Sequence, residues 1–123
     1  MSRASEMNRV LEELRGRSRE IEACAVVSRD GLVIARSVAD GAHGDHLGAM
    51  SGALLSVGEH AVRSLEQGEL KRLIIEGKNG SVIIGSAGPH AALVSICRGG
   101  AQPGLLFFDL GRTAEKVRKL LPS

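Results

Sequence analysis

Apolar residues near the start of the chain follow first a helical period and then a strand-like one. They recur every three or four positions among charged residues, at Met7, Val10, Leu11 and Leu14. This spacing predicts an amphipathic helix over about residues 4–17. Two short apolar runs at 23–28 and 32–38 then flank an Asp30-Gly31 turn, a pattern typical of a β-hairpin.

The middle of the chain predicts a loop and one long helix. Glycine and aspartate dominate residues 39–45, and Asp45 is a suitable N-cap for the segment that follows. From there to Gln67 the pattern is helical, and Gly68 is suited to end a helix. We therefore expect a helix over about residues 45–67.

The second half of the chain predicts three strands and a closing helix. Apolar runs joined by short turns place the strands at 70–77, 81–88 and 91–97. A loop over 98–104 brings Pro103 to a position suited to a first helical turn. One face of this helix, interrupted by Gly111, is marked by Leu106, Leu110, Val117 and Leu121. The run Leu-Leu-Phe-Phe-Asp-Leu is also compatible with a sixth strand.

The order of these elements predicts a mixed α/β (α+β) fold. Its strands are nearly continuous apolar runs, which indicates a sheet covered by helices on both faces. The first two strands form a hairpin and the last three a meander. A helix of about 22 residues spans roughly 33 Å, whereas five strands are roughly 20 Å across. The middle helix can therefore carry the chain from one sheet edge to the other, which favours the strand order 2-1-5-4-3.

The third predicted strand is an edge strand in this order. It has Leu73, Ile74 and Ile75 in sequence and no proline, so only Lys71 and Arg72 discourage pairing with another edge. We interpret Leu73, Ile74 and Ile75 as a homodimer contact that joins two five-stranded sheets into one of ten. The alternative is a short edge shielded by its own charges.

The middle helix has a wider apolar surface than a helix that only covers a sheet requires. Its apolar arc approaches about 200°, whereas just over about 100° is sufficient. The arc comprises Leu47, Met50, Ala53, Leu54, Leu55, Val57, Ala61, Val62 and Leu65. One flank of the arc is therefore expected to contact something besides its own sheet.

A row of small residues spaced by four lies beside this arc, at Gly48, Gly52 and Ser56. Small residues allow another backbone to approach, and each interior glycine costs about 1 kcal/mol of helix propensity relative to alanine. We interpret the row as a contact with a second copy of this helix or, failing that, with a protein partner. The alternative is chance placement in a chain with 16 glycines. Glu59 and Arg63 follow on the same side as an i, i+4 pair.

Composition narrows the classes of function. The 123 residues, 43% apolar and 24% charged, suit one soluble domain over 1–123. A formal net charge of +2, two phenylalanines and no tryptophan or tyrosine argue against a nucleic-acid partner. No apolar run reaches about 18 residues and the N-terminal segment is charged, so we expect a cytoplasmic protein without direct membrane insertion.

Residues capable of chemistry are few and scattered. Cys24 and Cys97 each lie in an apolar run, which favours two buried, reduced thiols over a disulfide. His43, Asp45 and His46 lie in a glycine-rich loop that lacks the preorganisation of a metal site. We therefore expect no catalytic residue, no cofactor and no metal.

With its elements in order, the chain resembles the Roadblock/dynein light chain family, in particular the prokaryotic MglB-like branch. The resemblance rests on residues 24–37, the long helix, residues 70–88 and 91–97, and the ending at 103–121. It implies a profilin-like fold: a five-stranded antiparallel sheet with the long helix on one face and the terminal helices on the other. It also implies dimers formed through the third strand and the long helix.

The resemblance also implies a function. Proteins of this family regulate or scaffold Ras-like small GTPases, and MglB-like members form dimers that stimulate GTP hydrolysis without supplying an arginine finger. On this basis we expect a non-enzymatic homodimeric regulator whose GTPase-binding surface includes Leu55, Glu59 and Arg63. One alternative is a scaffold or adaptor subunit of a larger complex that has no effect on GTP hydrolysis. A second is a small-molecule sensor, which requires a sizeable apolar cavity with converging polar groups.

Overall fold

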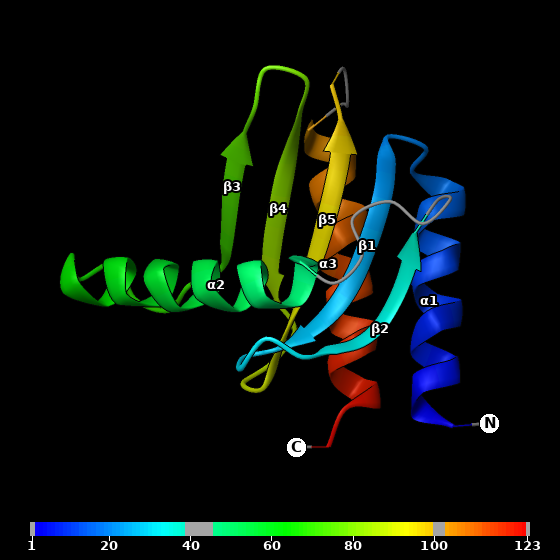
Figure 1. The fold of residues 1–123 in the computed structure, drawn as a ribbon, viewed down its shortest axis with the longest axis horizontal. Helices are drawn as coiled ribbons and strands as arrows, with labels where there is room; N and C mark the ends of the chain where they lie inside the picture. Colours follow the sequence, from blue (N-terminus) through cyan, green and yellow to red (C-terminus); the bar gives the residue numbers. More distant parts are fainter. Residues whose placement is uncertain (1, 39–45, 100–102, 123) are drawn as a thin grey trace.

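The computed structural model describes residues 2–38, 46–99 and 103–122 (Figure 1). Within these ranges every predicted helix and strand is present, in the predicted order. The elements are α1 (Arg3–Arg17), β1 (Ile21–Ser28), β2 (Val33–Val38), α2 (His46–Ser64), β3 (Arg72–Glu76), β4 (Gly80–Ser86), β5 (Ala91–Arg98) and α3 (Pro103–Leu120). The predicted loop over 39–45 and its N-cap Asp45 lie outside the described residues.

The sheet has the predicted topology. Its five strands are antiparallel and lie in the order β2-β1-β5-β4-β3. Helix α2 runs across one face of the sheet, whereas α1 and α3 lie along the strands on the other face (Figure 1). The predicted covering of both faces is confirmed.

Two apolar clusters form the core, one on each face of the sheet. Leu11 and Leu14 of α1 and Val117 of α3 belong to the first cluster, whereas Leu47 and Leu55 of α2 belong to the second. Adjacent strand residues alternate between the clusters: in β4, Ile83 faces the terminal helices and Ile84 faces α2. This alternation explains why the strands are continuous apolar runs in the sequence.

Helix α2 is shorter than predicted because Glu66, and not Gly68, ends it. Glu66 has a φ of 57°, in the left-handed region. The backbone N–H of Gln67 donates to the carbonyl of Val62 at 2.7 Å, and that of Glu66 donates to the carbonyl of Arg63 at 3.1 Å. These two bonds are the Schellman pattern that closes a helix C-terminus.

Helix α3 decides between a helix and a sixth strand, which the sequence left open. The Leu-Leu-Phe-Phe-Asp-Leu run is helical and is not a sixth strand. The helix begins at Pro103, as predicted, and continues through Gly111 without a break. Leu106, Leu110 and Val117 are buried on its inner face.

Both cysteines are free and buried in the cluster beneath the terminal helices, as expected. Burial raises the pKa of the Cys24 thiol to about 12 and that of Cys97 to about 11, from an ordinary value of 9.0. The uncharged thiol is favoured because the thiolate would lose its hydration. Neither sulfur is therefore suited to act as a nucleophile at neutral pH.

The same shifts predict that the free energy of unfolding decreases at alkaline pH. Above pH 9.0 the thiols of the unfolded chain lose protons that the folded chain retains. The stabilisation is complete below that pH and is lost as the pH rises toward the folded-state values. The slope reaches about 1.4 kcal/mol per pH unit for each thiol. Urea unfolding at about pH 8 and about pH 10 measures it. A Cys24→Ala, Cys97→Ala protein should show a smaller decrease, and an equal decrease would contradict the assignment.

Candidate protein-docking surface

Helix α2 presents its small side chains to its own protomer. Its buried residues recur at helical spacing and comprise Leu47, Gly48, Ser51, Gly52, Leu55 and Gly58. Most of them are glycine or serine, so the helix packs closely on the layer beneath it. Apart from Leu47 and Leu55, larger apolar side chains such as Met50 and Val57 are left exposed.

The outward face of α2 carries an apolar stripe, formed by Met50, Ala53, Val57 and Ala61. Met50 is 45% exposed and Val57 is 68% exposed, and both alanines are also exposed. Leu65, just after the helix, is 69% exposed. The apolar arc is thus wider than the sheet covers, as the sequence predicted, and the excess faces solvent.

Strand β3 is an unpaired edge whose side chains alternate between the two faces of the sheet. Ile74 and Ile75 are 41% and 40% exposed, whereas Leu73 packs partly against the cluster beneath α2. Ile75 pairs with Val82 of β4 and so lies on the same face as α2. Of the two flanking cations, Arg72 is held on the other face, where its guanidinium lies 4.5 Å from the centroid of the Phe107 ring.

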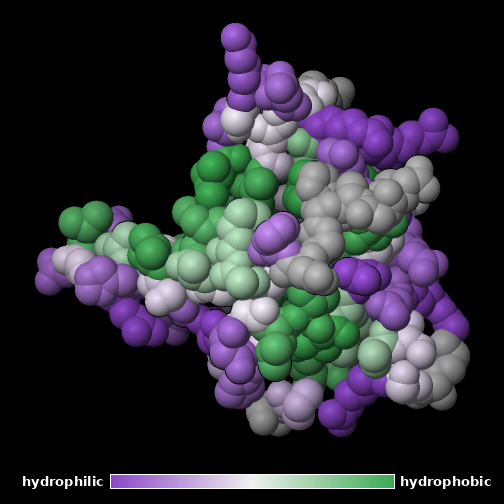
Figure 2. Space-filling view, viewed as in Figure 1, coloured by the Kyte–Doolittle hydropathy of each residue, from purple (hydrophilic) through white to green (hydrophobic). Residues whose placement is uncertain are grey.

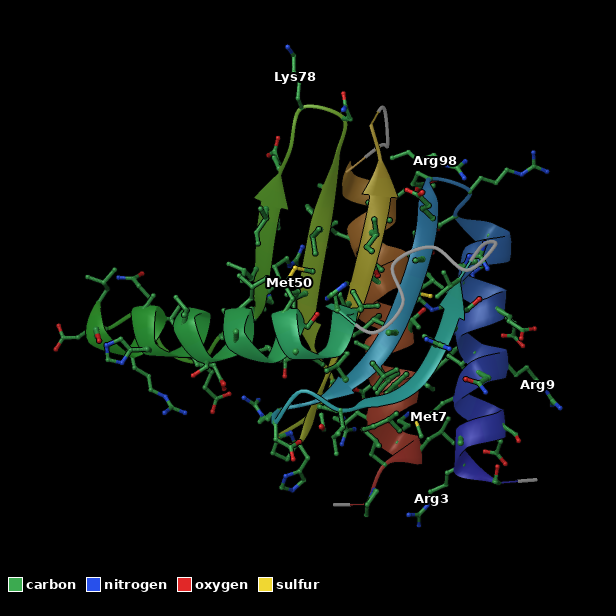
Figure 3. All side chains as sticks on the ribbon, in the orientation of Figure 1. Arg3, Met7, Arg9, Met50, Lys78 and Arg98 are labelled. Carbon is green, nitrogen blue, oxygen red and sulfur yellow. The ribbon has the colours of Figure 1, made fainter. Side chains whose placement is uncertain are left out.

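The α2 stripe and the β3 edge lie on one side of the molecule. Helix α2 crosses one end of the sheet and projects past β3, and β3 and β4 continue beyond it toward their connecting turn (Figure 1). Figure 2 shows hydrophobic residues along α2 and over the strands beside it. In Figure 3 the Met50 side chain projects from α2 toward this continuation of β3 and β4. The half-buried Val82 and Ile96 belong to the same apolar face.

Gly48 and Gly52 have a different role from the predicted one. A Cβ on Gly48 would lie 2.4 Å from the carbonyl oxygen of Gly31, and one on Gly52 would lie 3.0 Å from the Gly31 Cα. Gly31 is in the β1–β2 turn and has a φ of 91°, which favours glycine. The backbone of this turn therefore already covers both helix glycines within the protomer. Their interpretation as a contact with a second copy is therefore corrected, and of that row only Ser56 is exposed.

Of the three residues predicted to bind a GTPase, Leu55 is buried and Glu59 has an unpredicted ion-pair partner. Leu55 is 3% exposed and lies in the core beneath α2, so its side chain is not available to a partner. Glu59 forms an ion pair with Arg29, and not with Arg63. Arg29 also donates to the carbonyl of Pro89, so Glu59 ties α2 to the turns at one end of the sheet.

Arg63 remains on the surface. It lines a broad, open hollow beside the last turns of α2, together with Arg29, Glu59, Glu69 and Leu70. The hollow is polar and carries both signs of charge. None of its lining residues belongs to the apolar stripe, but Arg63 lies on the flank of α2 that follows from Ala53 through Ser56. The outward side of α2 therefore has an apolar strip with polar and charged residues beside it, the usual composition of a protein interface.

The sequence predicted the wide apolar arc of α2 but did not show which part of it faces the sheet and which part faces solvent. The signal was present in the small residues themselves: Gly48, Ser51, Gly52 and Gly58 recur on one helical face. A face of that kind packs most closely on the nearest backbone, which is here the chain's own hairpin turn. The apolar residues Met50, Ala53, Val57 and Ala61 are then left on the outside of the helix.

The described residues hold no group of three or more histidine, cysteine, aspartate or glutamate side chains placed to bind a metal ion. His46 is exposed at the start of α2, and its predicted neighbours His43 and Asp45 lie outside the described residues. Nor does any helix in this part of the chain have the length and hydropathy required to cross a bilayer.

Comparisons with solved structures define the fold. The structure of MglB with a tetrameric arrangement matches with a TM-score of 0.87 at 20% identity, over 98% of this chain and 90% of that chain. Gliding protein MglB from Thermus thermophilus matches with a TM-score of 0.86 at 19% identity, over 98% and 91%. Acanthamoeba castellanii profilin II gives 0.63 at 17% identity, over 92% and 97%. The fold is therefore profilin-like and most similar to MglB among these three.

Sequence comparisons then identify the family. The Roadblock/LC7 domain family matches residues 7–96. The chain is also 31% identical over 114 residues to the uncharacterized protein MJ1340 of Methanocaldococcus jannaschii, covering 93% of this chain and 98% of the relative. The chain belongs to the Roadblock/LC7 domain family, which confirms the resemblance found in the sequence.

Proposed function

We propose that residues 1–123 form one domain that acts in the cytoplasm as a non-enzymatic, homodimeric regulator of a Ras-like small GTPase. The observation that carries the proposal is the outward apolar stripe of α2 beside the unpaired edge of β3. Membership of the Roadblock/LC7 family and the MglB-like fold support it. A regulatory role suits a chain onto which the family resemblance carries no catalytic residue.

The geometry of α2 favours a dimer that uses both features at once. The helix projects past β3 (Figure 1), so a second copy paired along β3 meets the projecting half of α2. Exposed apolar groups on the two copies then cover each other, namely Val57 and Ala61 on the helix and Ile75 on the strand. Such burial stabilises the pair by about 25 cal/mol for each Å² of apolar surface removed from water.

The GTPase-binding surface is assigned to the border of this apolar stripe. Arg63 and Ser56 are exposed there, and Glu59 is partly exposed within its ion pair. Pairing two α2 helices doubles this border and forms a platform. A GTPase bound on the platform would have its own catalytic residues reorganised, since the regulator contributes no group to the reaction.

The test is single-turnover GTP hydrolysis by a Ras-like GTPase from the same organism, with and without this protein. We expect an acceleration on the order of 10- to 100-fold, below the 10³–10⁵ that an arginine finger supplies. An Arg63→Glu protein should lose most of the acceleration. The matched control is Arg3→Glu, the same charge change on the first turn of α1, far from α2 (Figure 3).

The result separates the candidate functions. Binding without acceleration would favour the scaffold or adaptor role, and no binding to any GTPase of the organism would refute the proposal. The small-molecule sensor is not favoured, because the apolar cavity beside α3 measures about 180 Å³ and the larger hollow beside Arg63, about 670 Å³, is polar and open. Sites for drug-sized ligands usually occupy about 300–1,000 Å³.

A further inference from the structure

The face of the sheet opposite α2 has a hollow of its own. Helix α1 packs on β1 and β2, and α3 packs on β4 and β5, which leaves β3 at the margin of the covered area (Figure 1). Between α3 and this margin lies a cavity of about 180 Å³. Its apolar walls are formed by Ile83, Ala87 and Leu93 on the sheet side and by Phe107, Leu110 and Ala114 on the helix.

Two glycines keep this cavity open. Gly85 of β4 and Gly111 of α3 both line it, and a Cβ on either would meet no atom within 4 Å. Gly111 is in a helix interior, where glycine is the least favourable residue after proline. Gly48 and Gly52 have close backbone neighbours that explain them, but no close contact with the described residues explains Gly111. Its missing side chain leaves room for a group from outside.

Basic side chains surround the opening. Lys71, Arg72 and Arg118 line the cavity, together with Glu115, which accepts a hydrogen bond from Arg118 at 2.9 Å. A shallower hollow shares Ile83 and Phe107 with the cavity and continues toward the β3–β4 turn. Its charged residues are Lys78, Arg98 and Glu76. Figure 3 shows Lys78 and Arg98 at the same end of the sheet. Among the described residues, the groove thus has five cations and two carboxylates.

Arg72 lines the cavity with its guanidinium over the Phe107 ring, the central carbon 4.5 Å from the ring centroid. A guanidinium in this position keeps its charge and can donate two N–H groups to a carboxylate. The contact also restricts the side chain in advance, which reduces the entropy lost on binding.

The volume of the cavity limits which side chain it can hold. An enclosed apolar cavity of about 150 Å³ accepts a benzene molecule, so this one fits a single ring or branched side chain. We propose that the groove between α3 and β3–β4 binds an acidic segment of a partner protein, which inserts one bulky apolar side chain between Gly85 and Gly111 and places its carboxylates on the basic rim. The site lies on the opposite side of the sheet from α2, and so extends the chain's function beyond the proposed GTPase regulation.

The experiment uses a fluorescein-labelled probe peptide, in which a single phenylalanine is flanked on both sides by glutamates. Two comparison peptides carry alanine for the phenylalanine or lysine for every glutamate. Anisotropy at physiological ionic strength measures their affinities for the full chain. We expect the probe to bind about tenfold or more tightly than the alanine peptide, since a buried aromatic side chain supplies at least that difference. The lysine peptide should not bind.

Variants of the protein locate the site. Gly111→Leu fills the cavity from α3 and should weaken probe binding about tenfold or more. The matched control is Gly16→Leu, at an exposed helix glycine that likewise has no atom within 4 Å of a Cβ. Arg72→Gln should weaken binding and reduce its dependence on salt. Amide shifts of Phe107 and Gly111 in the wild-type protein report occupancy directly.

Several results would overturn the proposal. They are the absence of probe binding, equal affinity for the phenylalanine and alanine peptides, and equal loss in the Gly111 and Gly16 variants. A fourth result combines two observations: the probe peptide does not bind, and the protein binds anionic phosphatidylglycerol vesicles unless it carries Arg72→Gln. That result would assign the basic rim to a lipid surface. None of these readouts involves GTP, so failure here and failure of the GTPase proposal are distinguishable.

Discussion

Replacing Gly48 with alanine is expected to lower the free energy of unfolding by about 3 kcal/mol, near the upper end of what overpacking costs. The added Cβ would lie 2.4 Å from the carbonyl oxygen of Gly31 and 3.1 Å from a methyl of Val33. The nearer obstacle is backbone, so it cannot be relieved by a change of rotamer. Either α2 or the β1–β2 turn must move. Urea unfolding of the purified variant, followed by circular dichroism, measures the effect.

The control for Gly48→Ala is the same substitution at Gly16, where a Cβ meets no atom within 4 Å. There the better helix propensity of alanine should raise stability by up to about 1 kcal/mol. The two substitutions therefore differ in sign. A Gly48→Ala protein that is as stable as the wild type but no longer self-associates would contradict the packing described above. That result would instead support Gly48 as a contact between two copies of the chain.

Replacing Val57 with glutamate is expected to raise the dissociation constant of the homodimer by about 100-fold or more. Val57 is 68% exposed on the outward face of α2, so the charge is harmless in the separate protomer. In the dimer it would be removed from water without a partner, which is costly. Sedimentation velocity over a range of concentrations measures the shift, and circular dichroism confirms that the helices are intact.

The matched substitution for Val57→Glu is Leu32→Glu. Leu32 is 65% exposed, but it lies in the β1–β2 turn, away from the β3 edge. This variant should dimerise like the wild type. A Val57→Glu protein that remains dimeric would place the interface elsewhere, and a wild-type chain that is monomeric at high concentration would remove the basis of the proposed platform.

The fold was accessible from the sequence because its determinants are local. Hairpin turns and continuous apolar runs marked the strands, and the length of the middle helix was enough to link the two edges of the sheet. The resulting order, β2-β1-β5-β4-β3, is the observed one. The end of α2 was misplaced because Glu66 adopts the left-handed conformation usually taken by glycine, although Gly68 follows two residues later.

The candidate site was less accessible because it depends on which elements meet. The sequence cannot show that Gly48 and Gly52 face the turn at Gly31. The contact joins a helix to a turn, and no sequence pattern relates the two segments. Likewise, Glu59 has Arg63 one helical turn away, yet it pairs with Arg29 across the structure. The exposed stripe through Val57 follows only when the buried face of α2 is known.

The alternation of Ile74 and Ile75 along β3 has a consequence for larger assemblies. Joining two such edges would extend both faces of the sheet together, so the two basic grooves would become neighbours at a fixed separation on the side away from the helical platform. A filamentous or tandem partner with two acidic anchors would then engage both grooves at once. Such bivalence would strengthen attachment by a factor of about 10²–10⁴ over a single anchor, without any new contact.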